Sequence, residues 1–91
     1  MDTIDINEND MQLFYTKINN NIIRLRKEKG VSQLNLATSI GHTSSTFFGK
    51  AEILAEGKHF NLEHLYKIAI ALNVDINEFF VGIETKDIKY N

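Results

Sequence analysis

Two observations predict an all-α fold for this chain of 91 residues. Apolar residues recur at intervals of three and four along most of the sequence, and glycines or capping residues separate the periodic segments. With 43% hydrophobic residues, the chain can bury one core of modest size. We therefore expect a compact five-helix domain over residues 9–81, between a flexible acidic N-terminus (residues 1–8) and a C-terminal tail (residues 82–91).

The first expected helix is long and amphipathic and covers residues 9–29. Its apolar stripe alternates spacings of four and three: Met11, Tyr15, Ile18, Ile22 and Leu25. A stripe of about two and a half heptads favours the first helix of a globular bundle over a coiled coil. Gly30 ends this helix. Met11 and Phe14, in its N-terminal turns, form a candidate surface for a protein partner.

Two short helices joined by a tight turn are expected over residues 31–48. Ser32 can cap the first of them. Leu36, Ala37 and Ile40 have the spacing of one buried face. Gly41 can adopt the left-handed conformation that closes a helix, so the chain turns there. This is the layout of a helix-turn-helix, whose second helix reads DNA in the major groove.

The second of these helices begins shortly after the turn, where Thr43 or Ser44 can cap it. Phe47 and Ala51 are four residues apart, and we expect both to face inward. Three side chains then lie on the outer side near the start of the helix: Ser44, Ser45 and Phe48.

A fourth helix and a short fifth helix complete the predicted domain. Asn61 is a good N-cap for the fourth. Its expected apolar stripe consists of Leu62, Leu65, Ile68, Ala69 and Leu72. Asp75 can cap the fifth helix, and one of its two phenylalanines is expected to fill the core. The candidate dimer interface is Phe79, Phe80, Val81 and Ile83. The tail, with Ile88 and Tyr90, is either an edge strand or unstructured.

The net charge of −2 is unevenly distributed along the chain. Residues 1–12 carry four acids and no base, and residues 60–91 carry three bases and five acids. Residues 13–59 carry seven bases against three acids, which gives +4 around the helix-turn-helix. The candidate phosphate-facing cations are Arg24, Arg26, Lys27, Lys29, Lys50 and Lys58. The alternative is that each is an ordinary solvated surface charge.

Little in the sequence supports catalysis or metal binding. The chain has no cysteine, and its three histidines lack the spacing and carboxylate partners of a metal site: His42, His59 and His64. No serine elbow or phosphate-binding GxxxxGK[ST] loop is present. No apolar run approaches the roughly 18 residues needed to span a bilayer. We therefore expect a cytoplasmic protein that is not an enzyme and holds no cofactor.

Several segments, in this order and spacing, resemble one family. They are LRKEKGVSQLNLA (residues 25–37), Gly41, the hydroxyl-rich turn (residues 43–46), NLEHLYKIAIALNV (residues 61–74) and the following DINEFF. Together they are similar to the lambda-repressor-like, or Xre-like, helix-turn-helix domains of phage repressors and small bacterial regulators, over residues 18–81. The resemblance implies a homodimer that binds duplex DNA sequence-specifically and regulates transcription, more often as a repressor.

The resemblance also implies roles for individual residues. Gln33 matches a position that contacts phosphate and braces the recognition helix. The implied base contacts are Ser44, Ser45 and Phe48, the last through a thymine methyl group. The alternative for Phe48 is packing in the core. The remaining phosphate contacts are Thr43, Thr46, Lys50 and, from the following loop, Lys58, while Phe60 anchors that loop in the core.

The chain departs from the family pattern at two places. The expected acid, Glu52, arrives one residue late and is followed by an enlarged loop to Gly57. We expect Glu52 to keep its structural ion pair with Arg26. Gly49 lies inside the recognition helix, where it either allows close approach to DNA or marks an earlier helix end.

Two other functions remain open. An antitoxin would use the same domain on DNA and hold a toxin with its N-terminal extension or its tail. A protein-interaction module would have lost DNA binding and would use exposed apolar side chains as contacts: Met11, Phe14, Phe48 and Phe80.

Overall fold

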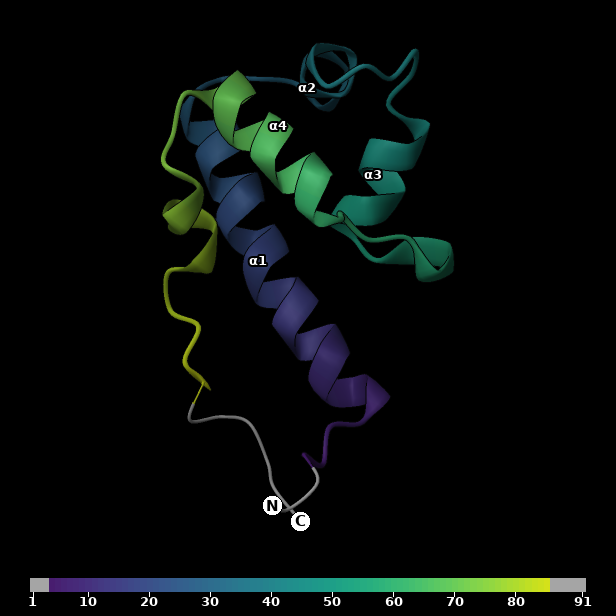
Figure 1. Ribbon diagram of the computed structural model, residues 1–91. Coiled ribbons are helices and arrows are strands. Elements are labelled where there is room, and N and C mark those ends of the chain that lie inside the picture. The colour runs from purple at the N-terminus through teal and green to yellow at the C-terminus, as the bar shows by residue number, and fades with distance from the viewer. Residues whose placement is uncertain (1–3, 86–91) are drawn as a thin grey trace.

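The computed structural model describes residues 4–85, and this part of the chain is all-helical (Figure 1). Its elements are α1 (Glu8–Glu28), α2 (Gln33–Ser39), α3 (Thr46–Glu52), the 3-10 helix η1 (Ala55–Gly57), α4 (Leu62–Leu72) and the 3-10 helix η2 (Ile76–Phe80). The all-α prediction is confirmed. The predicted fifth α-helix is wrong, because residues 76–80 form a 3-10 helix. The predictions for Ile88 and Tyr90 fall outside the described residues.

Helix α1 is well capped at both ends and begins one residue earlier than predicted. Asn7 and Asp10 form a reciprocal capping box, in which each backbone N–H donates to the other side chain. At the other end Gly30 has a φ of +68°, and the Val31 N–H donates to the carbonyl of Arg26 at 3.0 Å. The N-terminal half of α1 projects beyond the other helices (Figure 1), so Met11 and Tyr15 are only partly buried.

The core draws apolar side chains from all four α-helices and from η2. Its members are Ile18, Ile22, Leu25, Leu36, Ala37, Ile40, Phe48, Ala51, Phe60, Leu65, Ile68, Ala69, Leu72 and Phe79. The predicted buried faces of α1 and α2 and the core position of Phe60 are confirmed. Leu62 is the exception in α4: it is 79% exposed and lies on the outer side of the helix.

Two aromatic predictions are wrong, because both rings lie in the core. Phe48 is fully buried, so it does not present its ring on the outer face of α3 as a base contact. Phe79 is fully buried as well and is not available for a dimer contact. Phe80 and Ile83 pack partly against the core, which leaves Val81 as the exposed member of the predicted dimer interface.

The side-chain amide of Asn21 ties the C-terminal end of the described chain to α1. Its Nδ2 donates to the carbonyls of Phe79 and Val81, both at 2.9 Å. At the start of η2, Asp75 accepts a hydrogen bond from the backbone N–H of Asn77 at 2.8 Å, as a capping residue should. These contacts hold Phe79 over the core.

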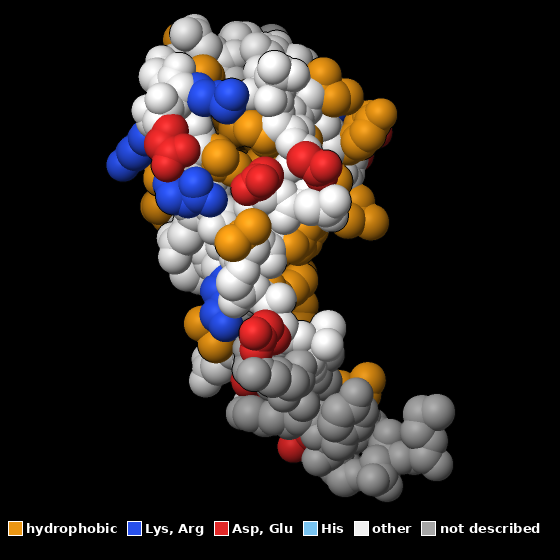
Figure 2. Space-filling view, turned by 90° about the vertical axis from the view of Figure 1, so that its left-hand side faces the viewer, with side chains coloured by type: hydrophobic (Ala, Val, Ile, Leu, Met, Phe, Trp, Pro, Cys, Tyr) orange, Lys and Arg blue, Asp and Glu red, His pale blue; other side chains and the backbone are white. Residues whose placement is uncertain are grey.

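Helix α4 carries several exposed apolar side chains. Helix α4 lies at the front of Figure 1, which becomes the right-hand edge of Figure 2, and hydrophobic side chains gather along that edge. The exposed residues of α4 that belong to this group are Leu62, Tyr66 and Ile70.

Candidate nucleic-acid interface

The turn between α2 and α3 contains the expected glycine, but α3 begins later than predicted. Gly41 has a φ of +100°, and the N–H of the next residue, His42, donates to the carbonyl of Ala37 at 2.9 Å. Ser45 is the N-cap of α3, although its hydroxyl makes no capping hydrogen bond. The predicted caps at Thr43 and Ser44 are therefore one or two residues too early. The Ser44 hydroxyl instead bonds the Thr46 hydroxyl at 3.2 Å.

Helix α3 buries Ala51 as predicted, but it buries Phe48 in place of Phe47. Phe48, Ala51 and Glu52 are buried, at intervals of three and one along the helix, while Phe47 is only partly buried. The side of α3 that remains exposed or partly exposed consists of Thr46, Gly49, Lys50 and, just beyond the helix, Ile53.

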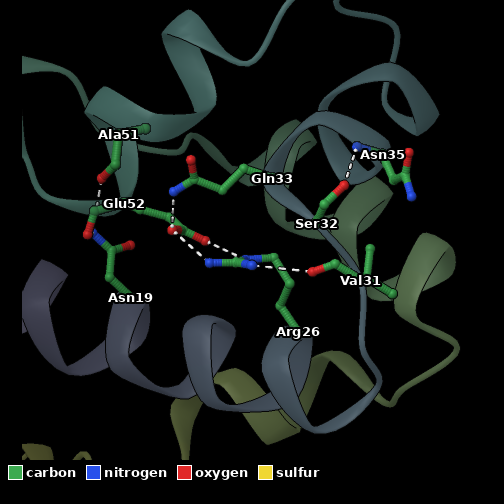
Figure 3. A network of polar contacts seen from close by, with 8 residues as sticks. All are labelled: Asn19, Arg26, Val31, Ser32, Gln33, Asn35, Ala51 and Glu52. Atoms are coloured by element: carbon green, nitrogen blue, oxygen red, sulfur yellow. Dashed lines mark hydrogen bonds and ion pairs between the residues drawn. The ribbon is translucent and has the colours of Figure 1, made fainter.

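The end of α3 is fixed by a buried ion pair between Arg26 and Glu52 (Figure 3). Arg26 donates through Nε to Glu52 Oε2 at 2.9 Å and through Nη2 to Oε1 at 3.2 Å. Its third nitrogen, Nη1, donates to the carbonyl of Val31 at 3.0 Å. The side chains are 10% and 2% exposed, so both charges are withdrawn from water. The ion pair predicted for these residues is present despite the late position of Glu52.

Gln33 connects α2 to the same carboxylate. Its Nε2 donates to Glu52 Oε1 at 2.8 Å (Figure 3). Glu52 thus accepts hydrogen bonds from α1 and from α2, which fixes α3 relative to both helices. The bracing role expected of Gln33 has a structural basis. Its amide nitrogen is committed to Glu52, so a phosphate contact by this nitrogen would compete with that bond.

Asn19 provides a second anchor for α3. This buried residue of α1 donates through Nδ2 to the carbonyls of Ala51, at 2.9 Å, and Glu52, at 3.1 Å (Figure 3). These carbonyls lie at the C-terminal end of α3, where backbone acceptors have no partner within the helix. Asn19 therefore caps α3 from a different helix. Among the described residues, no buried side-chain nitrogen or oxygen lacks a hydrogen-bond partner.

Gly49 lies against Gln33 within an unbroken helix. A Cβ added at Gly49 would lie 3.4 Å from Gln33 Oε1. This is an ordinary contact distance, so packing against Gln33 does not require a glycine here, and close approach to DNA stays a prediction. The early end is wrong, since α3 continues to Glu52.

Lys50, the one cation of α3, forms an ion pair with Glu56 in the following loop. The hydrogen bond and the positive charge of Lys50 lower the pKa of the Glu56 carboxyl. Glu56 has a φ of +55° and Leu54 a φ of +58°, so the enlarged loop adopts left-handed conformations that non-glycine residues seldom adopt. Lys58, the predicted phosphate contact of this loop, is exposed.

An aromatic cluster joins the turn, α3 and α4. The Phe47 ring stacks on His42, with centroids 5.2 Å apart, and lies 5.0 Å from the ring of His64. His64 and Asn61 form a capping box: His64 Nδ1 accepts the Asn61 N–H at 3.0 Å, and Asn61 Oδ1 accepts the His64 N–H at 2.8 Å. Burial, followed by the nearby His42, lowers the pKa of His64.

All the predicted contact residues except Lys58 lie between the start of α2 and the end of α3. Thr43, Ser44 and Thr46 are exposed, and Ser45 and Lys50 are partly exposed. Sequence reasoning missed the anchoring role of Asn19 and the Glu56 partner of Lys50. The only available signal for Asn19 was an asparagine at a helical position in line with the apolar stripe of α1, adjacent to Ile18.

The described residues contain no group of three or more histidine or acidic side chains that could hold a metal ion. Across residues 4–85, none of the helices combines the length and apolar character needed to cross a membrane. No protein-family model matches the chain, and no curated protein is detectably similar to it.

Proposed function

We propose that this protein binds duplex DNA sequence-specifically and regulates transcription, as a repressor, by placing α3 in the major groove. One observation supports this most strongly: α3 is held at its C-terminal end by Asn19, Arg26 and Gln33, while its N-terminal turn presents unpacked hydroxyl side chains. A recognition helix needs this combination, because its contacts discriminate bases only if the helix is held rigidly.

The base contacts proposed for this helix are made by hydroxyl groups. Ser44 and Ser45 keep the role expected from the sequence, and the shifted register adds Thr46 to them. Phe48 is removed from the set because it is buried. A hydroxyl both donates and accepts, so each such contact discriminates bases by only about 1 kcal/mol. Sequence-dependent DNA shape must then supply part of the specificity.

Phosphate contacts are proposed for Thr43, Lys50 and Lys58, with Gln33 acting mainly as the brace of α3. Lys50 can reach a phosphate by exchanging its Glu56 partner for the DNA backbone. The two side chains are 40% and 61% exposed, and such an exposed pair costs little to break. Each lysine that neutralises a phosphate contributes about 0.9 to the slope of log affinity against log salt concentration.

The test is a fluorescence-anisotropy titration of the full chain against the duplex from upstream of its own gene and a scrambled duplex of equal composition, repeated over a range of salt concentrations. The proposal expects tighter binding to the upstream duplex and an affinity that falls as salt rises. Weak, equal binding to both duplexes would exclude autoregulation through the upstream sequence. Binding to a library of random-sequence duplexes would then show whether the protein recognises another operator.

A protein-interaction module is the second candidate, and one specific observation favours it. Lys50 is the one cation of α3, and an acid of the same chain already neutralises it. In this case neither duplex nor library would be bound even at low salt. An antitoxin would combine DNA binding with a protein contact, for which the projecting N-terminal half of α1 offers Phe14 and Leu13.

A further inference from the structure

The outer face of α4 carries an apolar stripe that the described chain leaves uncovered. Leu62, Tyr66 and Ile70 are 79%, 64% and 63% exposed. Their spacing of four places them along one side of the helix, beside the buried side that packs on the core. Single exposed apolar residues are common, but a row of three large ones marks a contact surface.

An apolar groove adjoins the Leu62 end of this stripe. It has a volume of about 340 Å³ and lies between the N-terminal half of α1, the loop before α4 and the end of η2. Phe14, Tyr15 and Phe80 are among its lining residues, and Leu62 belongs both to the groove and to the stripe. The Tyr15 ring stacks on His59 at 4.5 Å, which gives the groove a firm wall.

Charged residues border one side of the stripe. Glu63 and Lys67 form an ion pair one turn apart at 3.4 Å, and both side chains are largely exposed. At 100° per residue, both lie on the side of the stripe away from the buried Leu65 and Ala69. The surface therefore has an apolar centre, an apolar groove at its Leu62 end, and one margin with a single acid and a single base.

We infer that this face binds a second copy of the chain, with the two α4 helices antiparallel and Tyr66 at the twofold axis. The stripe is symmetric about Tyr66, so Leu62 of each copy lies opposite Ile70 of the other. A twofold contact uses the same patch on both copies, and it requires a patch that is complementary to itself.

The charged margin favours this arrangement over a parallel one. With Tyr66 at the axis and a rise of 1.5 Å per residue, Glu63 of one copy and Lys67 of the other are offset by about 3 Å along the helix. The symmetry provides this opposite-charge pair twice. In a parallel twofold pair the charged margins of the two copies would lie on opposite sides of the contact, so Glu63 and Lys67 of one copy would meet neither residue of the other. The antiparallel pair is therefore the orientation that the charges select.

Three side chains are too few for a complete interface, since a standard one buries about 800 Å² on each partner. The groove wall beside Leu62 supplies the adjoining apolar surface. This interface lies on α4 and not at Val81, where the sequence prediction placed it. The inference does not depend on DNA binding.

The test is sedimentation velocity on the full chain from micromolar to near-millimolar concentration, with variants matched for the introduced charge. Wild type is expected to pass from monomer to dimer. Tyr66→Lys should weaken dimerisation by about thirtyfold or more, as expected for a central interface aromatic. Val81→Lys, which changes an exposed apolar residue outside the proposed interface, should leave the dimerisation constant unchanged.

A charge exchange tests the orientation. Glu63→Lys alone brings like charges together in the antiparallel pair and should weaken the dimer, whereas the double variant Glu63→Lys, Lys67→Glu restores both opposite-charge pairs and should recover it. Circular dichroism melting of each variant checks that the monomer is folded. A wild type that stays monomeric throughout, including one whose α4 face binds another protein, would overturn the inference. The inference would also be overturned if Val81→Lys abolished the dimer and Tyr66→Lys did not.

Discussion

Arg26 and Glu52 lie 26 residues apart in the chain and are joined by two hydrogen bonds, of 2.9 and 3.2 Å, beneath the start of α2. The pair connects the longest helix to the end of the proposed recognition helix. Because Gln33 donates to the same carboxylate, this buried acid joins α3 to both α1 and α2, beside the separate contact from Asn19. The C-terminal end of α3 is therefore held from its buried side, by hydrogen bonds from α1 and α2.

Removal of this acid should be strongly destabilising. Glu52→Ala leaves the Arg26 guanidinium buried without its anion, and we expect the free energy of unfolding to fall by about 3–5 kcal/mol. Urea denaturation followed by circular dichroism measures the change. Glu28→Ala, which breaks the exposed pair with Arg24, is the matched control and should cost less than about 1 kcal/mol. Equal losses in the two variants would contradict the structural role of Glu52.

The register of α3 predicts different costs for two neighbouring phenylalanines. Phe48 is fully buried, so Phe48→Ala should reduce the free energy of unfolding by about 3–5 kcal/mol. Phe47 is only partly buried, and Phe47→Ala should cost distinctly less. Denaturant titrations of the two variants give the comparison. A larger loss of unfolding free energy for Phe47→Ala than for Phe48→Ala would show that Phe47 is the buried ring, as first expected from the sequence.

Replacement of Gly49 by alanine should stabilise the folded protein. The residue has helical geometry, and the added Cβ would meet Gln33 Oε1 at an ordinary contact distance of 3.4 Å. Because alanine favours the helix over glycine, Gly49→Ala should raise the free energy of unfolding by up to about 1 kcal/mol. At Gly41 the same substitution should be unfavourable, since its φ is +100°. Stabilisation at Gly41, or a loss at Gly49, would show that the turn or the Gln33 contact differs from the one described.

Mild acid should weaken the fold through His64. Its pKa is lowered in the folded state, so the unfolded chain binds the proton more readily as pH falls below the ordinary value of about 6.5. The stabilising effect of neutral His64 is complete above that pH and is lost as pH falls through the lowered pKa. The groups around it are His42 and His59, together with Glu63 and Lys67 on α4.

The matched variant for this pH effect is His64→Gln, because glutamine also serves at this position of a capping box and does not titrate. Thermal melting between neutral pH and pH 5 should show a smaller decline for the variant than for wild type. Identical declines would assign the acid sensitivity to other groups.

Much of the helical framework was predictable because its signals are local. Ser32 and Asn61 cap helices where their sequence positions indicate, and Gly30 and Gly41 end helices with positive φ values. The buried faces of α1 and α2 follow directly from apolar spacing. The Arg26–Glu52 pair was also anticipated, through the family resemblance and not through local pattern.

Two kinds of feature could not be predicted: the exact helical register, and contacts between residues that are far apart in the chain. Two adjacent phenylalanines, Phe47 and Phe48, offer the same apolar signal, and the point at which α3 begins decides which of them is buried. Asn19 and Asn21 act on carbonyls more than 30 residues away, which no local pattern reveals. The distinction between an α-helix and the 3-10 helix over residues 76–80 likewise arises from packing.

The most direct test of DNA reading by α3 compares two charge reversals in the anisotropy titration: Lys50→Glu and Arg24→Glu. Both replace a lysine or arginine that has an acidic partner in the same chain. Arg24 lies two residues from Arg26, about 160° around α1 from the side that contacts α3. We predict that Lys50→Glu lowers affinity for the bound duplex by about tenfold or more and reduces the salt slope by about one, with little change for Arg24→Glu. Equal effects of the two reversals, or no effect of either, would contradict the assignment of α3 as the DNA-reading helix.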